Sequence, residues 1–207
     1  GFKMPSFHKS ISTPNGDLYL IGGSLPGTGT KSQKIYKYDF DNHTLNYCTN
    51  LKYGRSSHAL CFNNRYIYIV GGYLKNNIGF LANQVVTNKC ERYDIISNKV
   101  EEIEPCTNAV NSLSLAAFNG RYIYKFGGIG AEQTILHFIV SLACNVRKGS
   151  MKDITMEDPE PTFDGIGTDF VLLSTSAAVQ ITPTEIMVLG GYDNQNLGYK
   201  QTYILLT

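Results

Sequence analysis

The first candidate for chemistry in this sequence is the glycine-rich stretch from Gly22 to Lys31, which follows an apolar run. A phosphate-binding loop needs the pattern Gly-x-x-x-x-Gly-Lys-Ser/Thr and opens a helix. Here Lys31 follows a threonine, and the residues after it alternate as a strand does. The stretch is therefore predicted to be a loop between two strands and not a nucleotide site.

Histidines and carboxylates give no clearer chemical centre. The four histidines lack the i, i+4 or cysteine-paired spacing of metal ligands, and His58 is interpreted as a buried, hydrogen-bonded residue. Residues 153–169 hold six carboxylates, without the alternation of a calcium loop: Asp153, Glu157, Asp158, Glu160, Asp164 and Asp169. This segment is predicted to be a solvated or partner-contacting loop, neither helix nor strand. Since there is also no Ser-His-Asp order or nucleophile elbow, we expect no enzyme activity, no metal and no cofactor.

Composition narrows the classes of partner. A net charge of +1 argues against a nucleic-acid-binding surface, which is strongly basic. No run of about 18 apolar residues is present, so no membrane span is expected. Five scattered cysteines without Cys-x-x-Cys spacing are typical of reduced thiols, which favours a cytoplasmic location.

The elements that would position any site are repeated. An apolar strand that ends in Gly-Gly occurs four times, with the second glycine at Gly23, Gly72, Gly128 and Gly191. A Tyr-Asp pair keeps register with it at Asp39 and Asp94, 32 and 33 residues before the next Gly-Gly begins. Periods of this length indicate a propeller or solenoid.

The second unit carries most of a known pattern: Arg55 with His58 before one strand, Gly-Gly after the next, and Tyr-Asp at Asp94. On these residues the chain resembles the kelch-repeat β-propeller family. The family's outer-strand tryptophan is absent, and Leu45, Val100 and Met151 stand in its places.

The resemblance implies an all-β, kelch-type β-propeller with about four blades of four antiparallel strands. The units span approximately 6–49, 57–103, 112–155 and 170–207, with loops at 73–88 and 153–169, and residues 201–207 form a third strand with no fourth after it. An open arc of four blades would leave unpaired edges and exposed apolar faces. We therefore expect an incomplete portion of a six-bladed propeller.

The resemblance also implies where a protein partner binds: the loops just after Gly-Gly and around the arginine before each inner strand. The corresponding partner-binding positions are Ser24, Leu25, Arg55, Ser56, Ser57, Tyr73, Leu74, Lys75, Ile129, Tyr192, Asp193 and Asn194. Tyr73, Tyr192 and Arg55 are preferred, because tyrosine and arginine dominate interface hot spots. Arg55 can equally be a structural donor to backbone carbonyls. Only the second unit has this arginine, since its counterparts Ser6, Asn111 and the stretch near Phe170 depart from the pattern.

The predicted function is a non-catalytic protein–protein interaction module, a scaffold or adaptor such as a ubiquitin-ligase substrate adaptor. The alternative is a structural component of a large cytoskeletal or axonemal assembly, located at the cytoskeleton or cilium. A third reading is an oxidase or epimerase on the same fold, with a metal or a polar catalytic cluster at the axis.

Overall fold

The computed structural model describes residues 4–75, 84–106, 108–118, 122–130, 140–145, 162–163, 175–182, 185–192 and 202–206. In these ranges every regular element is a β-strand. None of the described residues belongs to a helix long and apolar enough to cross a membrane.

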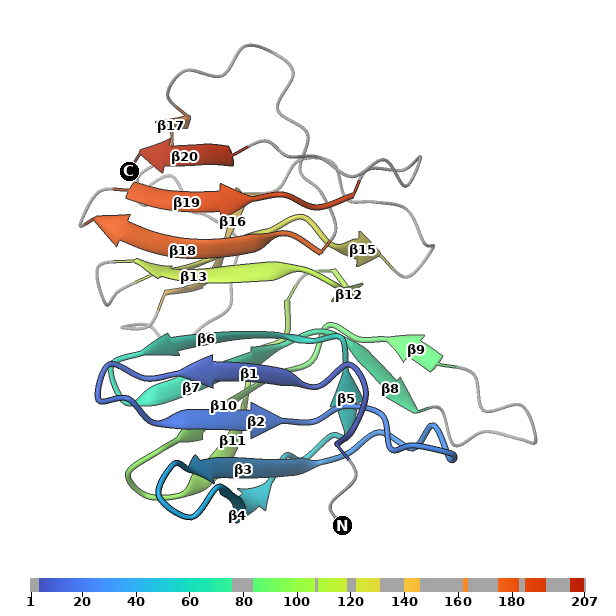
Figure 1. Ribbon diagram of the computed structural model, residues 1–207. Helices are drawn as coiled ribbons and strands as arrows, with labels where there is room; N and C mark the ends of the chain where they lie inside the picture. The colour runs from blue at the N-terminus through green and yellow to red at the C-terminus, as the bar shows by residue number, and fades with distance from the viewer. Residues whose placement is uncertain are drawn as a thin grey trace.

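The first two units each form a four-stranded antiparallel sheet (Figure 1). The first sheet runs from the inside outward through β1 (Lys9–Ser12), β2 (Leu18–Ile21), β3 (Lys34–Asp39) and β4 (Thr44–Asn50). The second sheet follows the same order with β6 (Ala59–Asn63), β7 (Tyr66–Val70), β10 (Cys90–Asp94) and β11 (Lys99–Ile103).

The last two units are less regular. The third sheet contains β13 (Ser114–Phe118), β14 (Tyr122–Phe126) and β16 (Val140–Asn145). The fourth contains β18 (Ala177–Thr182), β19 (Glu185–Leu189) and β20 (Thr202–Leu206), and its outer edge is β17 (Thr162–Phe163). The prediction that no strand forms within 153–169 is therefore wrong. Pairing with the unpaired edge of β20 satisfies backbone groups, and the local sequence cannot reveal that edge.

The innermost strands β1, β6, β13 and β18 neighbour one another in chain order, as the blades of a propeller do (Figure 1). One apolar core lies between the first and second sheets, around Ile21, Ile35 and Ile67. Another lies between the second and third sheets, around Val70, Val110 and Ile123. The predicted all-β, propeller-like class is confirmed.

The Tyr-Asp landmark has a local cause. Asp39 accepts hydrogen bonds at Oδ1 from the backbone amides of Asp41 and Asn42, at 2.9 and 3.0 Å. Asp94 accepts the equivalent bonds from the amides of Ile96 and Ser97, at 3.0 and 3.3 Å. An aspartate that binds amides two and three residues ahead stabilises a turn. The motif therefore ends the third strand and turns the chain into the outer strand.

The Gly-Gly landmark marks a close approach of neighbouring units. Gly71 has φ +64°, and a Cβ added there would lie 2.2 Å from the carbonyl oxygen of Val110. The amide of Gly72 donates to that same carbonyl at 2.8 Å, and the amide of Gly23 donates likewise to Arg55 O at 2.8 Å. Only glycine combines this backbone conformation with so little space.

A second recurring contact links the units without glycine. Phe7, Ser57, Ser112 and Thr175, each two residues before an inner strand, have φ between +53° and +58°. Each of the last three donates its amide to the carbonyl of the one before, at 3.1, 2.9 and 2.7 Å in chain order. Positive φ at non-glycine residues is uncommon. Its repetition shows that this chain of hydrogen bonds is a regular part of the fold.

Two small sheets lie beyond the Gly-Gly ends of the blades (Figure 1). One contains β5 (Arg55–Ser56), β8 (Tyr73–Lys75) and β9 (Gln84–Val86), and the other pairs β12 (Val110–Asn111) with β15 (Ile129–Gly130). The prediction that residues 73–88 form a loop throughout is therefore wrong, because β8 and β9 lie within this range. Runs of three residues are too short to show alternation, and the pairing depends on β5, which is distant in sequence.

Candidate protein-interaction face

The structure brings those predicted partner-binding positions that it describes to one end of the sheets, the end that carries β5, β8, β9, β12 and β15 (Figure 1). We call this end the loop face. Ser24, Tyr73 and Ile129 occupy equivalent places there, paired with Ser6, Ser56 and Asn111 respectively. Tyr192 follows the fourth Gly-Gly in the same way. The repeat register alone therefore collects residues from four units on one face.

The exposure of these side chains differs. Tyr192 is 51% exposed and Leu25 39%, so both are open to a partner. Five others are half-buried: Ser24, Ser57, Tyr73, Leu74 and Ile129. Lys75 ends β8, and Asp193 and Asn194 lie outside the described residues. Whether these residues bind a partner stays a prediction.

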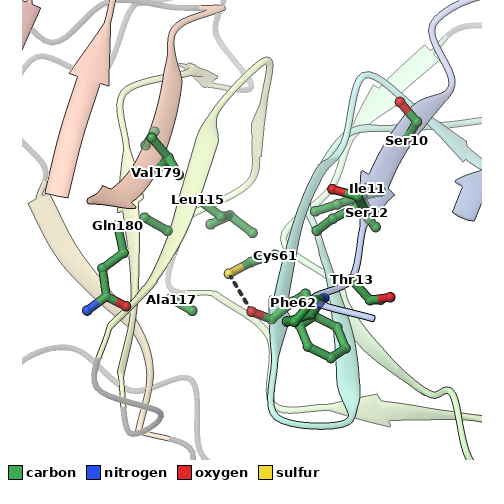
Figure 2. Close-up of a pocket in the computed structure, with 14 residues that line it drawn as sticks. Ser10, Ile11, Ser12, Thr13, Cys61, Phe62, Leu115, Ala117, Val179 and Gln180 are labelled. Carbon is green, nitrogen blue, oxygen red and sulfur yellow. Dashed lines mark hydrogen bonds between the residues drawn. The ribbon is translucent and has the colours of Figure 1, made fainter. Parts of the chain in front are cut away.

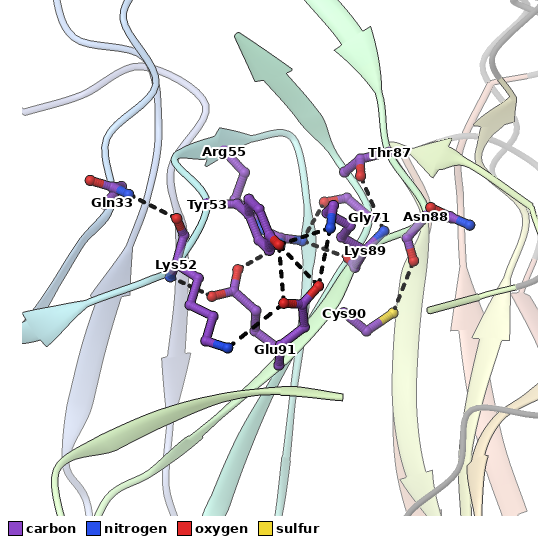
Figure 3. Close-up of polar contacts among 11 residues, drawn as sticks. Gln33, Lys52, Tyr53, Arg55, Gly71, Thr87, Asn88, Lys89, Cys90 and Glu91 are labelled. Carbon is purple, nitrogen blue, oxygen red and sulfur yellow. Dashed lines mark hydrogen bonds and ion pairs between the residues drawn. The ribbon is translucent and has the colours of Figure 1, made fainter. Parts of the chain in front are cut away.

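Arg55 and Ser56 are buried, with exposed fractions of 0% and 1%. The prediction that these two side chains belong to the partner-binding surface is therefore wrong. The Arg55 guanidinium donates to the carbonyls of Gly71 and Lys89, both at 2.9 Å (Figure 3). It also pairs with the Glu91 carboxylate at 2.5 Å, where both side chains are fully buried. Arg55 is thus a structural donor, since no part of its guanidinium can reach a partner.

The carboxylate of Glu91 completes this buried cluster. Its Oε1 accepts the backbone amide of Lys52 at 2.6 Å, while Oε2 faces Arg55. Burial raises the pKa of the Glu91 carboxyl, and the Arg55 charge opposes that rise. The sequence did not single out Glu91, because a glutamate inside a strand is ordinarily taken for a solvent-facing residue.

The counterparts of Arg55 are also corrected. In the third unit, Val110 stands where the second unit has Arg55. The Val110 amide donates to the Thr87 carbonyl as the Arg55 amide donates to the Ser32 carbonyl, both at 3.2 Å. Ser6 and Asn111 correspond instead to Ser56, by their pairing with Ser24 and Ile129. The hydrogen-bond register, which a single sequence does not show, fixes this shift by one residue.

His58 is fully buried, but neither of its ring nitrogens has a hydrogen-bond partner. Its ring lies against Gly22, where an added Cβ would be 2.8 Å from Cε1. Burial, and next the charge of Arg55, lower the pKa of His58 well below its ordinary value. The residue is a neutral packing element between the first two Gly-Gly pairs, and the predicted hydrogen bonds are not observed.

A cavity of about 590 Å³ lies among the inner strands (Figure 2). Residues from β1 and β6 line one side, and Leu115, Ala117, Val179 and Gln180 line the other. The polar side chains of its lining are hydroxyls, the Cys61 thiol and the Gln180 amide, with no carboxylate or imidazole among them. Within the described part of the chain, no group of three His, Cys, Asp or Glu residues could hold a metal ion.

Comparison with known families locates one match in the chain. Residues 54–107, the whole second sheet with β5, β8 and β9, match the family model described as Kelch motif. The second unit is a kelch repeat. The predicted resemblance to kelch repeats is confirmed over this unit, and kelch repeats generally mediate protein–protein interaction. A search of curated proteins finds none that matches the chain.

Proposed function

We propose that this kelch-repeat chain is a non-catalytic module that captures a partner protein on its loop face. The observation that supports this most is the equivalence of Ser24, Tyr73, Ile129 and Tyr192, which four units present at one end of the sheets. Loops held on a rigid scaffold commonly carry binding residues. Substrate-adaptor duty for a ubiquitin ligase is one form that this capture would take.

Replacing Tyr73 and Tyr192 together with alanine is expected to abolish partner capture while the chain stays folded. Large aromatic anchors each contribute about 2 kcal/mol or more to an interface, so loss of two such anchors weakens affinity by about 1,000-fold. The amount of partner captured from an extract of the natural source, by the parent chain and by the double variant, measures this loss. Alanine at Phe40 and Ile96, which are 56% and 72% exposed at the turns after the Tyr-Asp pairs, serves as the control. Equal capture by the loop-face variant and the parent would refute the chosen site.

One observation favours the alternative of a component in a large assembly. Phe40 and Ile96, 56% and 72% exposed, lie at the turns after the Tyr-Asp pairs, away from the loop face. Exposed apolar side chains on a second side suit a protein wedged among neighbours. In that case aspartate at Phe40 and Ile96, and not alanine at Tyr73 and Tyr192, would release the protein from its complex.

We further propose that additional blades complete the propeller. In the second sheet Val70 and Cys61 are 0% and 5% exposed, because the third sheet covers them. Their counterparts in the fourth sheet, Leu189 and Val179, are 41% and 50% exposed. The outer face of the fourth sheet thus has the composition of an inter-blade face.

The first sheet supports the same proposal from the other side. Ile67 and Tyr93 of the second sheet pack on the first and are 0% and 2% exposed. Their counterparts Leu18 and Tyr38 are only half-buried, and Tyr47 beyond them is 55% exposed. In the described residues, the inter-unit hydrogen-bond chain also ends without a backbone partner at the Phe7 amide and the Thr175 carbonyl. Both ends suit docking of a further blade, as in a six-bladed ring.

The mass of the intact protein from its natural source tests this proposal. We expect a mass well above 22.9 kDa, with further Gly-Gly units in its peptides, because two exposed inter-blade faces are unfavourable in water. A monomer of 22.9 kDa that unfolds cooperatively would contradict it.

A further inference from the structure

Lys31 is a buried cation without a counter-ion. Its side chain is 8% exposed, and its Nζ donates to Ser24 Oγ at 2.7 Å and to Gln84 Oε1 at 3.3 Å. Both acceptors are neutral, and among the described residues no carboxylate lies within ion-pair distance of Nζ. The segment between β8 and β9, residues 76–83, also contains no Asp or Glu. Burial lowers the pKa of this ammonium, as expected for an uncompensated charge.

The fold does not require a charge at this place. Lys31 pairs with Ser24 as Val86 pairs with Tyr73 in the second unit. The residues that follow are equivalent too, because the amides of Ser32 and Thr87 donate to Gly23 O and Gly72 O at 2.8 and 3.0 Å. An apolar side chain thus fills the position in the second unit. The lysine of the first unit therefore costs desolvation that this architecture can avoid.

Lys31 lines a polar pocket of about 380 Å³ beside the loop face. The rest of the wall combines polar side chains with one apolar residue: Thr30, Gln33, Lys52, Tyr53, Gly54 and Leu74. Lys52 and Lys89 share one carboxylate, Glu102, with Nζ to oxygen distances of 3.7 and 3.1 Å. Glu91, whose Oε1 accepts the Lys52 amide, is already paired with Arg55 (Figure 3). Lys89 is not in the wall but donates to the wall residue Tyr53 at 2.8 Å. Among the described ion pairs, Glu102 alone offsets Lys52 and Lys89 and none offsets Lys31, so positive charge is in excess at this pocket.

We propose that this pocket binds an acidic side chain of the partner protein, so that the captured segment carries an aspartate, a glutamate or a phosphorylated residue. An anionic group in the pocket supplies the counter-charge that Lys31 lacks, and ion pairs shielded from water are much stronger than exposed ones. Leu74 lies both in the pocket wall and among the predicted partner-binding residues, so one partner can occupy the loop face and the pocket together. The inference rests on the proposed function and specifies the chemistry of its ligand.

The test measures binding of a fluorescently labelled deca-glutamate peptide to the full chain at low salt, with deca-glutamine as the neutral probe. We expect the glutamate peptide alone to bind, and Lys31→Met and Lys52→Met each to weaken it about tenfold, as loss of a charged hydrogen bond does. Lys99→Met removes the same charge at the start of β11, whereas Glu102 lies near the end of that strand. This control should leave the affinity for the glutamate peptide unchanged. Lys31→Met should unfold at an equal or higher denaturant concentration, because it removes a buried charge.

Each other outcome overturns the inference. Deca-glutamate that fails to bind, or that binds both pocket variants as tightly as the parent, excludes the pocket. If inorganic phosphate displaces the peptide when the two are at equal molar concentration, the pocket is a site for free anions and not for a peptide. Natural partner capture that survives Lys31→Met but not the Tyr73 and Tyr192 double change removes this inference and leaves the proposed function in place.

Discussion

Replacing Arg55 with methionine is expected to lower the free energy of unfolding by about 3–5 kcal/mol, the range for breaking one side of a buried ion pair. The change leaves the Glu91 carboxylate with no exposure to water and no counter-ion. It also leaves the carbonyls of Gly71 and Lys89 without their donor. Urea unfolding followed by circular dichroism measures the loss.

Two further variants separate the ion pair from simple loss of packing. Adding Glu91→Leu to Arg55→Met should restore part of the stability, since the orphaned carboxylate is removed with its partner. Lys37→Met breaks the Lys37–Asp17 pair at 2.8 Å, whose side chains are 43% and 24% exposed. It should cost less than about 1 kcal/mol. A double variant less stable than Arg55→Met alone would show that the buried pair is not what makes the single change costly.

Replacing Gly71 with alanine is expected to lower the free energy of unfolding by about 2–5 kcal/mol, combining left-handed backbone strain with overpacking. The new Cβ would lie 2.2 Å from the carbonyl oxygen of Val110 in the next unit. That carbonyl also accepts the Gly72 amide, so it cannot move away without breaking a bond between units. Thermal or urea unfolding of the variant measures the effect.

Gly29→Ala is the matched control for Gly71→Ala. Its φ of +63° equals that of Gly71 within a degree, yet an added Cβ meets nothing within 4 Å. The control therefore carries only the backbone strain, about 1–2 kcal/mol. Equal losses for the two variants would mean that the close approach between units contributes nothing.

Both changes act at positions that the sequence marks, but for reasons that it does not contain. The Gly-Gly pair is visible as a repeat, whereas the carbonyl that excludes a side chain at Gly71 comes from Val110, 39 residues later. Arg55 is visible as part of a motif, and its burial depends on Glu91 in a strand that pairs with β7. Spacing identifies where constraint exists, and packing between distant segments determines what the constraint is.

The sequence alone determined the all-β class, the order of strands in the first two units and the set of positions on the loop face. These follow from local pattern, because strand alternation, Gly-Gly exits and Asx turns after Asp39 and Asp94 depend on neighbouring residues. The Gly-Gly repeat then places Ser24, Tyr73, Ile129 and Tyr192 equivalently in every unit.

Only the tertiary structure decided which of these side chains are accessible and which charges are compensated. Burial depends on all surrounding segments together. Arg55 is therefore fully buried and Tyr192 exposed, although arginine and tyrosine are both common at protein interfaces. The same holds for Lys31, whose sequence position in a glycine-rich loop suggests a solvated residue. Its burial against Ser24 and Gln84 follows from the meeting of loops from two units, which no local pattern encodes.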